Sequence, residues 1–433
     1  MKKILLPLLF ACSFSAFAQT NKLKELISKK ADSLQSQIIT WRRDFHEHPE
    51  LGNHEFRTAG IVAKYLQSLG LEVKTGIATT GVVGILKGGH PGPVVALRAD
   101  MDALPVTERT PVPFASKVKT MYNGQEVGVM HACGHDSHMA MMMATAEILS
   151  SIKSELHGTI KFIFQPAEEG LLPGEKGGAE EMVKQGVLEN PKVDVIFGMH
   201  IFSFMPVGTI NYRSGGAMAA VNSIKIVITG KSSHGSQPWA GVDPIVTSAE
   251  IINNLQTIVS RNINLTQNAA VVTVGAINGG NRPNIIPEKV EMLATLRALS
   301  MADEQTIIKR VHEIVNKTAE MNGATAEIST FTHYPVTYNN PALTSEMVPS
   351  LQQTAGAANI ISGNALTGSE DFSFFAEKVP GFFIFLGGMP KGTDPLTVPV
   401  NHSADFFIDE SAFPLGVNAM CNLALDYTAA HGK

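Results

Sequence analysis

Short apolar runs alternate with helical stretches along most of the chain, and this alternation limits the folds that the chain can adopt. The runs typical of buried strands cover residues 82–86, 94–97, 160–164, 195–198 and 382–386. Helical periodicity covers residues 20–48, 56–70, 139–151 and 178–186. Together they predict an α/β fold, with an open mixed or parallel sheet that carries helices on both faces.

One internal segment, residues 219–332, follows a different order. It contains a strand at 222–229, a helix at 244–263, strands at 270–277 and 289–299, a helix at 303–322 and a strand at 325–332. This β-α-β-β-α-β order is that of a ferredoxin-like α+β domain. Because the α/β pattern resumes afterwards, we expect residues 19–218 and 333–433 to form one domain and residues 219–332 to be inserted into it.

The first residues have the features of a secretory signal peptide. Met1-Lys2-Lys3 is basic, residues 4–10 are apolar, and Ala16-Phe17-Ala18 is an A-x-A cleavage site. We therefore expect cleavage between Ala18 and Gln19 and a periplasmic or secreted protein. Lipid anchoring through Cys12 is the alternative location, because residues 9–12 loosely resemble a lipobox.

Two classes of partner are excluded by composition. No other segment approaches the roughly 20 apolar residues that a transmembrane helix needs. The net charge is −5 and the pI about 6.3, so the chain lacks the basic surface of a nucleic-acid-binding protein.

Polar side chains cluster at the ends of the predicted strands. The residues concerned are Asp100, Asp102, Glu168, Glu169 and His200, together with Cys133 and His135 at the start of a helix and His402 near the C-terminus. In open α/β sheets, ligands bind at the carboxyl ends of the strands, so these side chains should converge. One thiolate, three imidazoles and one carboxylate from this set suit Zn²⁺ or Mn²⁺. These five ligands exceed the need of one structural zinc, whereas two ions sharing a bridging water would use them all.

Each candidate also has a purely structural interpretation. Cys133 and His135 could belong to a turn around Gly134, although an extended segment would send both side chains to one side. Glu168 and Glu169 could be a solvated pair, and the histidines could be satisfied core residues. By default, His131 and His138 are assigned either to this structural role or to contacts that support the ligands from outside. Asp100 and Asp102 are candidates to orient metal-bound imidazoles. Cys133 could pair with Cys421 in an exported protein, but we favour a metal ligand at Cys133 and a buried thiol at Cys421.

The motifs resemble the M20 metallopeptidase family, and within it the amidohydrolase branch of aminoacylases, hippurate hydrolases and auxin-conjugate hydrolases. The similar stretches span almost the whole chain in order: RRDFHEHPELGNHE, ALRADMDALPV, MHACGHDSHMAMMMATAEIL, FIFQPAEEG, FGMHI, SSHGSQPWAGVDP, GGNRPNIIPEKVEMLATLRAL, GSEDFSFFAEKVPGFFIFLGG and NHSADFFIDE.

The resemblance implies a set of roles. Cys133 would be shared by two metal ions, Mn²⁺ or Zn²⁺ with Co²⁺ or Ni²⁺ as further candidates, and the remaining ligands would be His135, Glu169, His200 and His402. Glu168 would be the general base, with Asp102 orienting a ligand. His234 would stabilise the oxyanion across a dimer interface and Asn284 would bind substrate, so the inserted domain would be both lid and dimerisation surface. The substrate would be an N-acyl amino acid or a peptide-like amide.

Two alternatives remain open at this point. The wider family includes dipeptidases and carboxypeptidases, although these usually place an aspartate where Cys133 stands. An exported solute-binding protein is the alternative from another class, but it would not need Glu168 beside a full ligand set. The chain also departs from the family pattern at Asn401, at Trp239, and in apparent insertions at residues 117–127 and 171–178.

Overall fold

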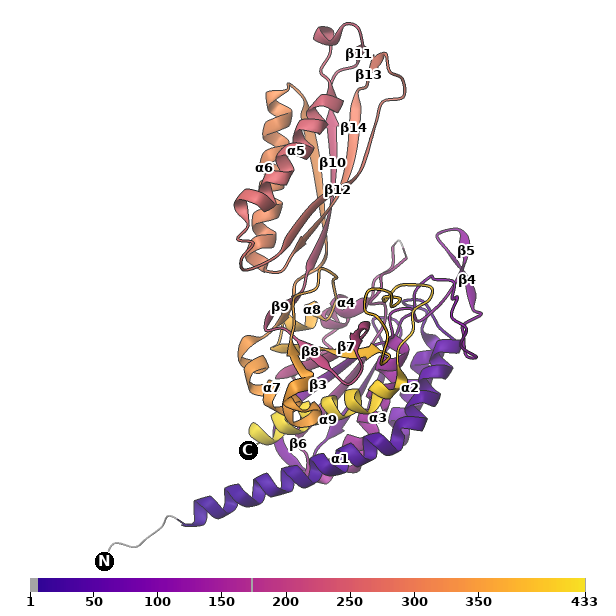
Figure 1. Cartoon of the computed structure of the whole chain (residues 1–433), viewed down its shortest axis with the longest axis vertical. Helices are drawn as coiled ribbons and strands as arrows, with labels where there is room; N and C mark the ends of the chain where they lie inside the picture. The colour runs from indigo at the N-terminus through magenta and orange to yellow at the C-terminus, as the bar shows by residue number, and fades with distance from the viewer. Residues whose placement is uncertain (1–6, 173, 433) are drawn as a thin grey trace, which may run out of the picture. The chain divides into compact units, whose positions relative to one another are not determined.

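The computed structural model describes residues 7–172 and 174–432, with side chains from residue 20 onward. Residues 1–6 of the predicted signal peptide lie outside this part. The chain forms two compact units (Figure 1). Unit 1 contains the described residues up to 215, with residues 339–363 and those from 374 onward. Unit 2 contains residues 216–338 and 364–373. It therefore includes the predicted insertion and, in addition, residues 364–373 from later in the chain.

Unit 1 is built on one mixed eight-stranded sheet. In spatial order its strands are β1(Glu72–Ile77), β2(Gly81–Lys87), β6(His157–Gln165), β3(His90–Asp100), β7(Val195–Pro206), β18(Gly381–Met389), β8(Ile210–Tyr212) and β17(Ile360–Ser362). The central strands β6, β3, β7 and β18 are parallel to one another, whereas β1 and β2 are antiparallel. The predicted α/β fold with an open mixed sheet is confirmed.

The helix that begins at the predicted ligand His135 is buried on nearly all sides. This helix, α3(His135–Ser151), packs against α1(Pro7–Glu47) and α9(Phe413–Ala430) (Figure 1). Fourteen of its residues are buried, four of them methionines, and flexible thioether side chains fill irregular gaps well. The helix begins four residues earlier than the predicted start at 139, because the first-turn N–H groups need no acceptor inside the helix and polar residues can occupy that turn.

Three further helices of unit 1 pack against strands of the sheet: α2(Phe56–Ser68), α4(Gly178–Lys184) and α7(Pro341–Ala355). The short helix α8(Ser373–Ala376) begins at the last residue grouped with unit 2. A two-stranded hairpin, β4(Lys119–Tyr122) and β5(Gln125–Gly128), occupies the apparent insertion at 117–127. Among the described residues, no helix combines the length and apolar character that crossing a membrane requires.

Unit 2 has the predicted ferredoxin-like order. Its antiparallel sheet runs β12(Ala270–Gly279), β14(Lys289–Ala298), β10(Ala220–Thr229), β15(Thr325–Tyr334). In β10 every second residue, Ile224, Ile226 and Ile228, is buried, as expected for a strand with one covered face. The helices α5(Pro244–Asn262) and α6(Met301–Met321) pack against that face, and each begins at a side-chain cap, Asp243 and Ser300.

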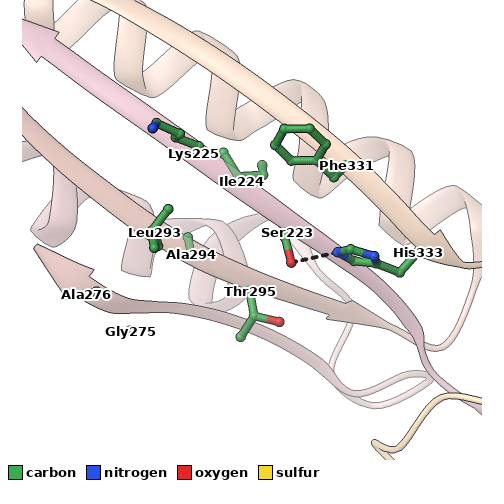
Figure 2. A pocket seen from close by; sticks show the side chains of 10 residues that line it. All are labelled: Ser223, Ile224, Lys225, Gly275, Ala276, Leu293, Ala294, Thr295, Phe331 and His333. Carbon is green, nitrogen blue, oxygen red and sulfur yellow. Dashed lines mark hydrogen bonds between the residues drawn. The ribbon is translucent and has the colours of Figure 1, made fainter. Parts of the chain in front are cut away.

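The opposite face of the unit 2 sheet carries an open groove of about 490 Å³ (Figure 2). Leu293 and Phe331 are exposed on it. Ser223 Oγ and His333 Nε2 form a hydrogen bond at 2.9 Å. Lys225 Nζ forms an ion pair with Glu291 Oε2 at 2.6 Å. No predicted site residue lines this groove.

Candidate metal centre

Neighbouring strands of the unit 1 sheet end at one edge, and their register brings the predicted site residues there. Asp100 ends β3 and lies opposite Gln165, the last residue of β6. Glu168 and Glu169 follow β6 within four residues. His200 was expected just past its strand, but β7 continues to Pro206, so His200 lies within the strand, opposite Phe385 of β18.

A sharp bend at Gly134 places the two ligands at the start of α3. Gly134 has φ +100°, and a Cβ atom there would lie 2.7 Å from Ile201 Cγ2, so both the conformation and the space require glycine. The premise of an extended segment is therefore wrong, because a left-handed residue separates Cys133 from the helix. The side chains nevertheless converge: ligand atoms of Cys133, His135 and His200 lie within 4.8 Å of one another.

The sulfur of Cys133 lies at the centre of the cluster. Cys133 Sγ is 3.2 Å from His200 Nε2 and 3.3 Å from His402 Nε2. Besides the group with His135 and His200, it forms a second group with Glu169 and His402. Burial and the nearby Glu169 and Glu168 carboxylates raise the pKa of the Cys133 thiol well above its ordinary value. A bound cation would reverse this effect, because metal-coordinated thiols lose their proton.

The imidazole rings are oriented so that Nε2 faces this cluster. His135 Nδ1 donates to the Asp102 carbonyl oxygen at 2.8 Å, and His200 Nδ1 donates to the Ile201 carbonyl oxygen at 2.8 Å. His135 Nε2 is then buried without a hydrogen-bond partner, 3.8 Å from Glu169 Oε1. A buried ring nitrogen beside a carboxylate and a thiol, with no hydrogen-bond partner of its own, fits a divalent metal ion that takes the place of its proton.

The charges around His135 also fit a cation. Burial lowers the pKa of His135, but the carboxylates of Asp100 and Asp102 outweigh burial and raise the pKa to about 10. Burial lowers the pKa of His200 well below its ordinary value, so this imidazole is neutral and able to act as a ligand. The cluster thus attracts positive charge at His135 while keeping His200 unprotonated.

Two aspartates support these ligands. Asp102 accepts a hydrogen bond at 2.8 Å from the backbone N–H of Glu169, and Asp100 accepts one at 2.6 Å from His138 Nδ1. Arg98 pairs with Asp100 at 2.6 Å. His138 Nε2 accepts from the Ile201 N–H at 2.8 Å, so both nitrogens of His138 are occupied and His138 has a structural role.

His131 differs from the other imidazoles of this region. It is buried, and neither of its ring nitrogens has a hydrogen-bond partner. Burial lowers its pKa to about 3, so the ring is neutral. No ligand group of the cluster includes His131, which is consistent with the structural assignment.

The turn that carries the two glutamates is held by a residue that the sequence analysis missed. Ala167 has φ +53°, and its N–H donates to Glu55 Oε1 at 2.9 Å. Thr80 Oγ1 donates to Glu55 Oε2 at 2.6 Å. Glu168 follows Ala167, is 6% exposed, and groups with His135 and Glu169. Glu55 stands in the quoted stretch HPELGNHE, but only its tertiary contacts reveal its role.

The other two predicted residues lie in unit 2. His234 ends β11(Ser233–His234), which pairs with β13(Ile285–Ile286), and Asn284 immediately precedes β13. The N–H of Gly235 donates to the Asn284 carbonyl oxygen at 2.8 Å. The structure therefore brings His234 and Asn284 together within unit 2. Trp239, on the adjacent 3₁₀ turn η2(Pro238–Ala240), is 80% exposed.

Comparison with known proteins agrees with this arrangement. The model of "Peptidase family M20/M25/M40" matches residues 96–426. Thermostable carboxypeptidase 2 of Saccharolobus solfataricus is 39% identical, over 94% of this chain and 99% of that protein. N-acetylcysteine deacetylase of Bacillus subtilis is 37% identical, over 90% of this chain and 96% of that protein. A solved structure of a Bacillus subtilis dinuclear metal binding peptidase of the M20 family is 34% identical, with TM-score 0.76, over 92% of this chain and 99% of that chain.

A mixed α/β sheet with a ligand cluster at its carboxyl edge, together with these matches, defines a metal-dependent hydrolase of the amidohydrolase and peptidase type. The chain belongs to peptidase family M20/M25/M40, as the sequence motifs predicted.

Proposed function

We propose that the protein is an exported amidohydrolase that cleaves the amide bond of N-acyl amino acids or similar small amides, with two divalent metal ions per chain. The observation that carries the proposal is the convergence of five ligand side chains around the Cys133 sulfur, with the buried carboxylate of Glu168 beside them. The name of the Bacillus subtilis deacetylase relative supports an N-acyl substrate.

The five ligands would form two metal sites that share the Cys133 sulfur. The side chains of His135, Glu169, His200 and His402 would complete the two sites. The donor set suits Mn²⁺ or Zn²⁺. When bound, such ions polarise the substrate carbonyl and lower the pKa of a bound water toward neutrality.

The chain's own residues would move the proton. Glu168 takes the proton of the attacking water and returns it to the leaving amine. The Asp102 carboxylate accepts from the backbone N–H of Glu169 and the Asp102 carbonyl oxygen accepts from His135 Nδ1, so both ligands keep their orientation. His234 would stabilise the oxyanion, a contact worth about 3 kcal/mol per donor, and Asn284 would bind substrate.

Assembly and location complete the proposal. His234 and Asn284 lie together in unit 2, and we propose that they reach the metal centre of a second copy in a homodimer. The signal-peptide features of residues 1–18 support export.

Hydrolysis of peptides is the second candidate. Two relatives from Saccharolobus solfataricus, each 39% identical, are named thermostable carboxypeptidases. The assay that separates the candidates compares N-acetyl amino acids with peptides that have a free amino terminus. Faster cleavage of the peptides would favour the second candidate.

The test compares wild type, Glu168→Gln and the control Glu180→Gln, each loaded with Mn²⁺ or Zn²⁺. Glu180 is an exposed helix residue paired with Lys184, so its variant should equal wild type. We expect Glu168→Gln to retain its metal and lose about 10²–10⁴-fold in kcat. A Glu168→Gln variant that hydrolyses as fast as wild type would refute the assignment, and a wild type that binds amides without cleaving them would favour a binding protein.

A further inference from the structure

Asn401, one of the positions where the chain departs from the family pattern, contacts the segments that carry three of the proposed ligands. Asn401 Nδ2 donates to the carbonyl oxygen of Cys133 at 2.9 Å and to that of Ile201 at 3.1 Å. Its Oδ1 accepts from the backbone N–H of Ser203 at 3.2 Å. One amide therefore joins the loop before α3 to strand β7, and His402 follows directly in the chain.

The partners of this amide fix its orientation. Two carbonyl oxygens can only accept, so they require the NH₂ group, and the backbone N–H of Ser203 can only donate, so it requires the oxygen. Ser203 is itself held, because it is fully buried and its hydroxyl donates to the Pro399 carbonyl oxygen at 2.8 Å. Leucine has similar volume but can make none of these bonds.

One of the contacted carbonyl groups also sets the tautomer of a ligand. The Ile201 carbonyl oxygen that accepts from Asn401 also accepts from His200 Nδ1 at 2.8 Å. Fixing that oxygen therefore fixes the direction in which His200 Nε2 points, toward Cys133 Sγ at 3.2 Å.

The backbone after Asn401 is strained, and the same contacts hold it. His402 has φ +71°, a left-handed conformation that is unfavourable for a residue other than glycine. Its N–H donates to the Ala132 carbonyl oxygen at 2.8 Å. With Asn401 bound to Cys133, two consecutive residues lie against Ala132 and Cys133, and this arrangement brings His402 Nε2 within 3.3 Å of the sulfur.

We propose that Asn401 is a positioning residue for the metal ligands, which sets the placement of Cys133, His200 and His402 relative to one another through its side-chain amide. The proposal rests on the metal centre of the proposed function. Residues that orient ligands from outside typically contribute about 10–100-fold to metal affinity.

The experiment uses the full chain and Co²⁺, whose visible spectrum reports ligand geometry and thiolate coordination. The variants are Asn401→Leu, which removes every hydrogen bond of the amide, and Asn401→Asp, which retains the acceptor and loses both donated bonds. Asn359→Leu is the control, because Asn359 is exposed and its side chain donates only to Ala355 among the described contacts. Affinity is measured by chelator competition, and unfolding of the metal-free proteins by circular dichroism.

We expect both Asn401 variants to bind Co²⁺ about 10–100-fold more weakly, with an altered sulfur-to-cobalt charge-transfer band, while Asn359→Leu equals wild type. If both Asn401 variants match wild type in affinity and spectrum, or lose only metal-free stability, the positioning role is refuted and the proposed function stands. If wild type itself binds no Co²⁺ through sulfur, the proposed function fails together with this inference. A Leu variant that does not fold leaves the decision to the near-isosteric Asp variant.

Discussion

Replacing Glu55 with glutamine should reduce the loss of stability that the metal-free protein suffers as pH rises. Glu55 is fully buried and accepts hydrogen bonds from Ala167 N–H at 2.9 Å and Thr80 Oγ1 at 2.6 Å. Glutamine has the same shape, its oxygen can accept from Ala167, and its NH₂ group can donate to the Thr80 hydroxyl. The substitution therefore removes the titration of residue 55 while preserving its contacts.

The magnitude follows from the pKa. Burial, and next the charge of Asp102, raise the pKa of Glu55 from the ordinary 4.5 to about 8. A raised acid pKa means that the folded protein retains a proton that the unfolded chain releases above about pH 4.5, so stability falls as pH rises from there to about pH 8. At about 1.4 kcal/mol per unit, the upper limit of this loss is about 5 kcal/mol.

Urea unfolding of metal-free wild type and Glu55→Gln at about pH 6 and pH 8 measures the effect. From pH 6 to pH 8, the free energy of unfolding of Glu55→Gln should rise relative to that of wild type by about 2 kcal/mol. A difference that does not change with pH, or that moves in favour of wild type as pH rises, would show that Glu55 is ionised in the folded protein.

Two further predictions concern the charges of the site. Arg98→Met should lower the free energy of unfolding by about 3–5 kcal/mol in chemical denaturation, because it leaves the buried Asp100 carboxylate without its arginine. The control is Arg109→Met, which breaks an exposed ion pair. An equal loss of stability in both variants would contradict this prediction. Metal affinity should rise with pH, because an incoming ion must displace protons from His135, whose pKa is about 10, and from the Cys133 thiol, whose pKa is raised. Calorimetry of metal binding in buffers of different ionisation enthalpy should detect the released protons. Metal binding without proton release would contradict this prediction.

The sequence predicted the parts of the fold that depend on local pattern. The buried strands β2, β3, β6, β7 and β18 appear as apolar runs because they are covered on both faces. Short strands such as β8 and β17, of three residues each, carry too little pattern to be found. The hairpin at residues 119–128 lies in the apparent insertion, and its Asn123-Gly124 turn, with φ +49° and +78°, is a hairpin signal that the sequence itself contains.

In the candidate site too, local sequence pattern predicts some features, whereas tertiary contacts determine the others. Cys133, His135, Glu169 and His200 could be predicted to converge because each follows or lies in a central strand or begins a buried helix. The sequence offers a turn at Gly134 only as an alternative to an extended segment, because it does not show that Ile201 leaves no space for a side chain there. The roles of Glu55 and Asn401 cannot be predicted from the sequence, because each depends on a hydrogen bond to a residue more than a hundred positions away, Ala167 for Glu55 and Cys133 for Asn401.

The most direct test of the central claim is the metal content and metal positions of the purified protein, from elemental analysis and anomalous diffraction. The account predicts about two divalent ions per chain, both in contact with the Cys133 sulfur or its neighbouring ligands, and loss of the shared contact in Cys133→Ala. A protein that binds no divalent ion, or binds it away from Cys133, His135 and His200, would contradict the account.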